Sequence, residues 1–226
     1  MPGKRYEESV KQVEEGKRYA VRDAIATLRK FKPAKFDETV DLSVSLGIDP
    51  KKTEQMVRGT FSLPKGLGRK VRIIVFASPD RATAARAAGA EEAGGDELVK
   101  KVGDGWLDFD IAISTPDMMG KVGRLGRVLG PQGKMPSPKS GTVTENVENA
   151  VREFKAGKVE YRNDETGNLH IPVGKCSFKD EDLATNVGAI LDHIASIRPP
   201  AVKGRFVKKA VLSSTMSPGV LLETRE

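Results

Sequence analysis

The feature that most constrains the fold is a change in hydrophobic periodicity along the chain. From Val40 to Leu46, apolar residues alternate with polar ones, which is typical of a strand with one buried face. From Val71 to Ala77 the chain is almost continuously apolar, which indicates a strand covered on both faces. One uniform sheet does not suit both patterns, so we expect two structural units separated by the Pro- and Gly-rich segment 64–70.

The central part of the chain is expected to alternate strands and helices. An Ala-rich helix at 80–88 and a short helix at 96–102 lie between the strand at 71–77 and a second apolar strand at 109–114. Helical segments follow from Pro116, and an amphipathic helix over 144–156, capped by Thr144, closes this part. This order predicts a small parallel sheet with helices on both faces.

The two ends of the chain have the alternating pattern of half-buried strands. Residues 159–162 and 169–173 flank a polar turn and predict a β-hairpin, and a helix is expected at 179–197 before two terminal strands. The predicted fold class is therefore α/β with two domains joined by a hinge. Domain one is an α+β domain with hairpins and helices, made of residues 1–67 plus 160–226, and domain two is an inserted Rossmann-like parallel α/β domain at 68–159.

The charge of the chain favours a polyanionic partner. Its 226 residues carry a formal net charge of +7, and two long stretches, 118–144 and 193–222, contain no acidic residue. The first carries Lys121, Arg124, Arg127, Lys134 and Lys139, and the second carries Arg198, Lys203, Arg205, Lys208 and Lys209. Two solvated surfaces are the alternative interpretation.

Several classes of protein are disfavoured by what the sequence contains. No apolar stretch approaches the length of a membrane span, and the basic N-terminal residues precede no apolar core, so we expect a cytoplasmic protein without membrane partners. The single cysteine, Cys176, forms no internal disulfide and supports no Cys-ligated zinc site.

No catalytic constellation emerges from the motifs. The glycine-rich stretch 120–134 fails the Walker template, and no dinucleotide fingerprint follows either apolar strand, which leaves backbone contact with phosphate or a flexible loop as its role. Cys176 and His170 lack a third orienting group, and His193 is expected to be structural or exposed. The acids Asp104, Asp108, Asp110 and Asp117 are interpreted as solvated caps, so we expect neither a metal nor a cofactor.

Several motifs, in order along nearly the whole chain, resemble bacterial members of the large-subunit ribosomal protein one family, the universal ribosomal protein of the mobile stalk beside the tRNA exit site. In the first part these are AKFDETV (34–40), LGIDP (46–50), VRGT (57–60) and LPKGLG (63–68). In the central part they are GWLDFD (105–110), AISTPDMMG (112–120), LGRVLGPQG (125–133) and MPSPKSGTV (135–143). The match ends with KAGKVEYRNDETG (155–167) and STM (214–216).

The resemblance implies an RNA-binding structural protein of the large ribosomal subunit without catalytic activity. It implies contact with large-subunit rRNA, with exit-site tRNA and with other ribosomal components, and repression of translation by binding the protein's own operon mRNA. A nucleotide- or sugar-phosphate-handling α/β enzyme is the alternative function.

The resemblance also implies an RNA site in domain one. Its residues would be Lys35, Phe36, Glu38, Thr39, Asp164, Thr166, Gly167, His170, Thr215 and Met216. Lys35 suits phosphate, the two threonines suit ribose hydroxyls, and Glu38 would accept from a sugar hydroxyl or base amine. Phe36 could instead be a core residue. Secondary basic contacts would come from Lys121, Arg124, Arg127, Lys134 and Lys139. Ser217 stands where the family commonly has glycine, which places the geometry of that turn in question.

Overall fold

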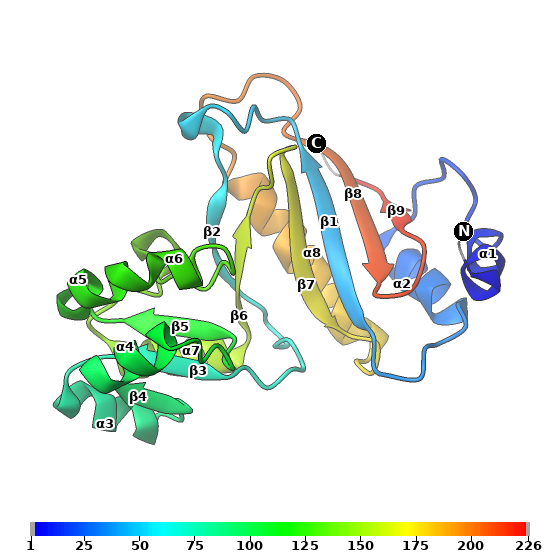
Figure 1. Ribbon diagram of the computed structural model, residues 1–226. Helices are drawn as coiled ribbons and strands as arrows, with labels where there is room; N and C mark the ends of the chain where they lie inside the picture. Colours follow the sequence, from blue (N-terminus) through cyan, green and yellow to red (C-terminus); the bar gives the residue numbers. More distant parts are fainter. Residues whose placement is uncertain (1–2, 225–226) are drawn as a thin grey trace. The chain divides into compact units, whose positions relative to one another are not determined.

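The computed structural model describes residues 3–224 and divides the chain into two compact units (Figure 1). Unit 1 contains residues 1–68 and 159–226, and unit 2 contains residues 69–158. Both units mix helices and strands, and unit 2 contains a parallel sheet, so the predicted α/β fold class is confirmed. Among residues 3–224, no helix is both long and apolar enough to span a membrane.

Unit 1 is built on a four-stranded antiparallel sheet in the order β7-β1-β8-β9. The strands are β1 (Thr39–Leu46), β7 (Asn168–Lys175), β8 (Val207–Ser214) and β9 (Val220–Leu222). Helices α2 (Val21–Lys30) and α8 (Asp180–Ser196) pack against each other and against one face of the sheet, and the short α1 covers Lys4–Val10. Every second residue of β1 is buried under these helices, as the alternating pattern predicts.

A second, two-stranded sheet joins β2 (Arg58–Ser62) to β6 (Lys158–Arg162). The predicted hairpin between 159–162 and 169–173 is therefore wrong, because β6 pairs with β2 whereas β7 pairs with β1. Only an isolated bridge joins Asn163 to Leu169. The Asn163 side-chain Oδ1 accepts from Val57 N (3.0 Å), and the backbone N–H of Asn163 donates to Val57 O (3.0 Å). These two hydrogen bonds hold the chain on β2 beyond the end of β6.

Unit 2 has a three-stranded parallel sheet in the order β4-β3-β5. Its strands are β3 (Ile73–Phe76), β4 (Glu92–Gly94) and β5 (Ile111–Ser114), of which β4 has no signal in the apolar pattern. Ile73 and Val75 pack toward α3 (Pro79–Ala87) and α7 (Val147–Ala156), whereas Phe76 packs toward α4 (Asp96–Gly103) on the other face. Helices on both faces explain why β3 is apolar throughout.

Two local predictions in unit 2 need correction. Helix α7 is capped by Asn146, whose side chain accepts from Asn149 N at 3.2 Å, and not by Thr144, whose hydroxyl accepts from Asn146 N before the helix begins. Much of the glycine-rich stretch is helical, in α5 (Met119–Val122), α6 (Gly126–Leu129) and the intervening 3₁₀ turn, which confirms the helical segments expected from Pro116 and excludes the alternative of a flexible loop. At Gly130 an added Cβ would lie 2.4 Å from Gly126 O, so this turn requires glycine.

Candidate nucleic-acid interface

The sheet of unit 1 has one face that its helices leave open. The half-exposed positions of β1 are polar and point away from α2 and α8. The register places His170 opposite Ser43, and Ser213 opposite Asp41. We call this surface the open face; it consists of Thr39, Asp41, Ser43 and Ser45 of β1, His170 and Pro172 of β7, and Lys209, Val211 and Ser213 of β8.

Six of the ten predicted RNA-binding residues lie at one end of the open face. They precede or begin β1, or they follow β8: Lys35, Phe36, Glu38, Thr39, Thr215 and Met216. Thr39 N donates to Thr215 Oγ1 (3.0 Å), and Thr215 N donates to Thr39 O (3.0 Å), so the two segments are locked side by side although 176 residues separate them.

Glu38 lies inside this junction and is only 6% exposed. Its carboxylate accepts from Ser214 Oγ (2.6 Å), Met216 N (3.0 Å) and Ala34 N (2.9 Å). Burial raises the pKa of Glu38, but these hydrogen bonds outweigh burial, and the net pKa is lowered. The expected role of Glu38 as an acceptor for RNA therefore does not fit: its oxygens are occupied by the two loops, and we assign it as a positioning residue.

Phe36 and Met216 flank the junction as exposed apolar side chains. Phe36 is 55% exposed and Met216 52% exposed, so Phe36 is not a core residue. Both line a cavity of about 390 Å³ that reaches toward Val40 and Leu183. Apolar groups of this kind suit van der Waals contact with a ribose or a base.

Two further polar residues at this end were missed by sequence reasoning. Lys175 Nζ donates to Thr39 Oγ1 at 2.8 Å, and Asp37 accepts from the Ser177 hydroxyl at 2.8 Å. Lys175 ends β7 directly opposite Thr39. The assumed hairpin concealed this neighbour, because only the β1–β7 register brings Lys175 to Thr39.

Of the other four predicted residues, Asp164, Thr166 and Gly167 lie at the opposite end of the open face, in the turn that precedes β7, and His170 lies on β7 itself. Asp164 Oδ1 accepts from Thr166 N (2.9 Å), Thr166 Oγ1 (2.8 Å) and Asn168 N (2.7 Å), which closes the turn on itself. These hydrogen bonds, led by that from Asn168, hold the pKa of Asp164 well below its usual range. The carboxylate therefore organises the turn, as Glu38 does at the first end.

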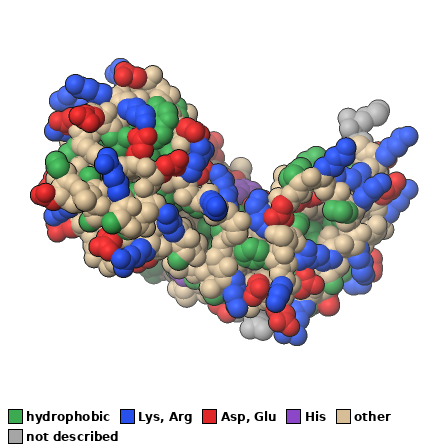
Figure 2. Space-filling view, turned by 90° about the horizontal axis from the view of Figure 1, so that it is seen from below, with side chains coloured by type: hydrophobic (Ala, Val, Ile, Leu, Met, Phe, Trp, Pro, Cys, Tyr) green, Lys and Arg blue, Asp and Glu red, His purple; other side chains and the backbone are tan. Residues whose placement is uncertain are grey.

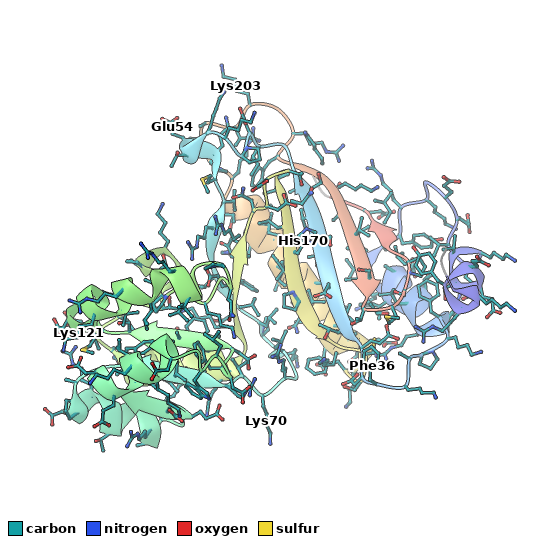
Figure 3. All side chains as sticks on the ribbon, viewed as in Figure 1. Phe36, Glu54, Lys70, Lys121, His170 and Lys203 are labelled. Atoms are coloured by element: carbon teal, nitrogen blue, oxygen red, sulfur yellow. The ribbon has the colours of Figure 1, made fainter. Side chains whose placement is uncertain are left out.

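Gly167 and His170 connect this turn to the sheet. Gly167 has φ +84°, and its carbonyl accepts from Leu46 N at 3.0 Å, where β1 ends. His170 is exposed, with Nδ1 3.1 Å from Ser43 Oγ and Nε2 3.6 Å from Asp164 Oδ2. In Figure 3, His170 lies on the strands and Phe36 lies toward one end of them. The ten predicted residues thus occupy the two ends and the middle of one face.

The predicted secondary basic residues of unit 2 differ in what they already contact. Lys121 pairs with Asp96 at 2.6 Å, and Lys134 donates to Leu107 O at 3.0 Å. Arg124, Arg127 and Lys139 are exposed and form no ion pair within residues 3–224. Acidic and basic side chains are intermixed on the surface drawn in Figure 2, so net charge alone does not mark a binding face.

The remaining candidates have structural partners. Tyr161 Oη lies 2.9 Å from His193 Nε2, and the imidazole ring of His193 also packs on the ring of Phe61. His193 therefore belongs to the packing of α8. Asp110 accepts from Arg72 N at 3.0 Å and binds the Arg69 guanidinium. Cys176 is half-buried, and burial raises the pKa of its thiol. Ser217 has no positive φ, so the turn after Met216 does not need glycine.

Comparison with known proteins identifies the family. A sequence model described as the ribosomal protein L1p/L10e family matches residues 28–218. Curated relatives include the large ribosomal subunit protein uL1 of Kosmotoga olearia, which is 51% identical over 97% of this chain and 95% of the relative. They also include that of Cutibacterium acnes, which is 52% identical over the same shares. The chain therefore belongs to the ribosomal protein L1p/L10e family.

Proposed function

We propose that this protein binds large-subunit rRNA through the open face of unit 1. As a member of its family it is a structural, non-catalytic protein of the large ribosomal subunit in the cytoplasm, and the alternative of a nucleotide-handling enzyme is wrong. The observation that supports rRNA binding is the preorganised face itself. Hydroxyl, imidazole and lysine groups line it together with one carboxylate, that of Asp41, while its two loops are held in place by the internally hydrogen-bonded carboxylates of Glu38 and Asp164.

Such a face suits recognition of a folded RNA by shape. Protein contacts to structured RNA go largely to 2′-hydroxyls and phosphates, and bases are read where they are unpaired. Thr39, Ser43 and Ser213 offer hydroxyls along the face, and Lys35 and Lys175 offer cations at one end. Domain one, residues 1–67 plus 160–226, would be the RNA-binding domain, and 68–159 the inserted domain.

We further propose three functions that the resemblance to the family implies. The protein would assist release of deacylated tRNA from the exit site, with Arg124, Arg127 and Lys139 as exposed cations for a second RNA contact. It would repress translation of its operon mRNA by binding a hairpin that mimics its rRNA site. It would contact other ribosomal components when bound.

The decisive experiment separates shape from charge. Thr215→Val removes a hydroxyl at the junction without changing charge, and it also deprives Thr39 N of its acceptor. We expect stalk-rRNA affinity to fall about 10- to 100-fold, corresponding to roughly 1–3 kcal/mol, with the salt dependence unchanged. Filter binding at several salt concentrations would measure both quantities.

Two controls accompany the Thr215 variant. Arg127→Ala should weaken binding of cognate and scrambled RNA by the same modest factor and reduce the salt dependence. Urea unfolding should show that Thr215→Val remains folded. A folded Thr215→Val protein with unchanged cognate affinity would contradict the proposed site.

A further inference from the structure

We infer that the RNA footprint on unit 1 extends beyond the turn at Asp164 to a lysine-lined cavity that holds RNA phosphates. This inference rests on the proposed rRNA binding and adds a site outside the ten residues discussed above. The cavity has a volume of about 480 Å³ and is lined by Gly47, Ile48, Asp49, Lys52, Gln55, Ala201, Lys203 and Lys208. We call it the lysine cavity.

The cavity is built where β1 ends. Leu46 N donates to Gly167 O (3.0 Å), and the next amide, Gly47 N, donates to Phe206 O (2.6 Å). The turn 163–167 and the segment 201–206 therefore flank the same two residues. A Cβ on Gly47 would lie 2.1 Å from Arg205 O, so the close approach of these segments requires glycine at this position.

Two of the three lysines in the cavity, Lys203 and Lys208, are free to bind a ligand. The second acid-free stretch supplies five basic residues near this end, and its two arginines have internal partners: Arg198 donates to Val202 O and Gly204 O, and Arg205 donates to Val207 O. Lys203 and Lys208 are exposed, and neither ammonium has a hydrogen bond or ion pair within the described part of the chain. Lys52 forms one long ion pair, in which its Nζ lies 3.9 Å from Asp49 Oδ2.

The charge of the cavity indicates an anionic ligand. Three lysines line it against one carboxylate, and Asp49 Oδ1 already accepts from Lys51 N at 3.2 Å. Ammonium groups hold phosphates as point charges without demanding a fixed geometry. A cluster of flexible lysines is therefore better suited to bind the phosphates of a polymer backbone than to bind a planar carboxylate ligand.

Continuity with the open face points to RNA as the source of these phosphates. Ile48 lines the cavity and lies beside Gly167, with its Cγ1 only 3.2 Å from the position of a Cβ on that glycine. Lys209, next to Lys208, pairs with Ser45 on the open face. Figure 3 shows Phe36, His170 and Lys203 in that order along the direction of β1. An RNA lying along this strand, roughly 25 Å in length, reaches the cavity as it leaves the sheet.

The test uses the full chain and a paired charge control. The variant Lys203→Gln/Lys208→Gln removes two cavity charges, and Arg22→Gln/Lys30→Gln removes two exposed charges from α2, which covers the other face of the sheet. Affinities for a stalk-rRNA fragment and a scrambled RNA are measured against salt concentration. We expect the cavity variant to bind the stalk fragment about tenfold more weakly and to lose about two units of salt slope, one for each phosphate contact.

A second arm locates the contact on the RNA. The affinities of both proteins are measured for stalk-rRNA fragments shortened from either end. Shortening from one end should abolish the difference in affinity between the wild-type protein and the cavity variant. Equal affinities and slopes for the cavity variant and the α2 control would overturn the inference. If the wild-type protein fails to prefer stalk RNA over scrambled RNA, the proposed function fails instead, which is a separate result.

Discussion

Glu38 and Asp164 are acidic residues within a site that we propose for a polyanion, Glu38 buried in it and Asp164 partly exposed, and the structure explains how both can be present there. Each carboxylate accepts at least three hydrogen bonds: those to Asp164 come from its own turn, and those to Glu38 come from Ala34 and from Ser214 and Met216 at the end of β8, so the negative charge is stabilised within the protein. The loops then present threonine hydroxyls and backbone groups. These two carboxylates shape the site, and in the proposed complex the neighbouring neutral and basic groups contact RNA.

The lowered pKa of Asp164 predicts a loss of stability in acid. A carboxyl group whose pKa is lower in the folded state than in the unfolded state stabilises the fold above its unfolded pKa, near 3.8, and loses that contribution as pH falls. Asp164→Asn should therefore flatten the decline in unfolding free energy between about pH 5 and pH 2. Urea unfolding of the wild-type protein and of Asp164→Asn across this pH range measures the change in unfolding free energy.

The neighbouring substitution Glu165→Gln is the control for this prediction, because Glu165 is exposed and makes no hydrogen bond in the closed turn. It should leave the pH dependence unchanged. If the unfolding free energy of Asp164→Asn falls with pH as steeply as that of the wild-type protein, the Asp164 carboxylate contributes nothing to the loss of stability in acid.

The residues of the candidate site could be proposed from the sequence only through family motifs. No composition or periodicity distinguishes Thr215 from any other threonine, and its neighbour Thr39 is 176 residues away. Lys175 was not proposed, because its place beside Thr39 depends on strand register. Lys203 and Lys208 were named only as members of an acid-free stretch, because their assembly with Lys52 depends on loop packing. The apolar alternation of β1 did predict which of its residues face outward.

Among the secondary-structure elements, the least predictable feature was the pairing of strands. The segments β6 and β7 have strand patterns and a polar turn between them, which locally favours a hairpin. Asn163 changes the outcome, because its hydrogen bonds to Val57 keep the chain on β2 and β7 then joins β1. The local alternation of apolar and polar residues predicts where the strands are but not which strands pair, because pairing is decided by contacts between distant segments.

Helix α7 offers a direct test of the corrected cap. Asn146→Ala should lower the free energy of unfolding of unit 2 by about 1 kcal/mol, because Asn149 N loses its acceptor at the helix N-terminus. Thr144→Ala should have a smaller effect, because Thr144 contacts only the amide of Asn146. Thermal or urea unfolding of the two variants distinguishes them, and a reversed order would restore Thr144 as the cap.

On the scale of the whole molecule, each unit has a hydrophobic core of its own. The core of unit 1 joins residues from both ends of the chain, whereas unit 2 packs around the two faces of its parallel sheet. The change in periodicity along the sequence anticipated this contrast. The short β4 was missed because three residues are too few to establish a pattern.

Removal of the insert tests whether unit 1 suffices for RNA recognition. A chain that joins residues 1–67 to 160–226 by a short linker should fold and keep most of its specific affinity for stalk rRNA, because every residue of the open face is retained. Circular dichroism would verify folding, and filter binding would measure affinity. Loss of specific binding by the folded shortened chain would place the main site in residues 68–159.

The central position of β1 also has a consequence for the order of events during synthesis. Both of its neighbours, β7 and β8, belong to the last third of the chain, so β1 leaves the ribosome long before either partner has been translated. Unit 2 is continuous in sequence and can complete its fold in the meantime. The open face therefore forms last. For most of translation β1 remains unpaired, with its apolar side chains Val40, Leu42, Val44 and Leu46 uncovered, and during this time it is most exposed to aggregation.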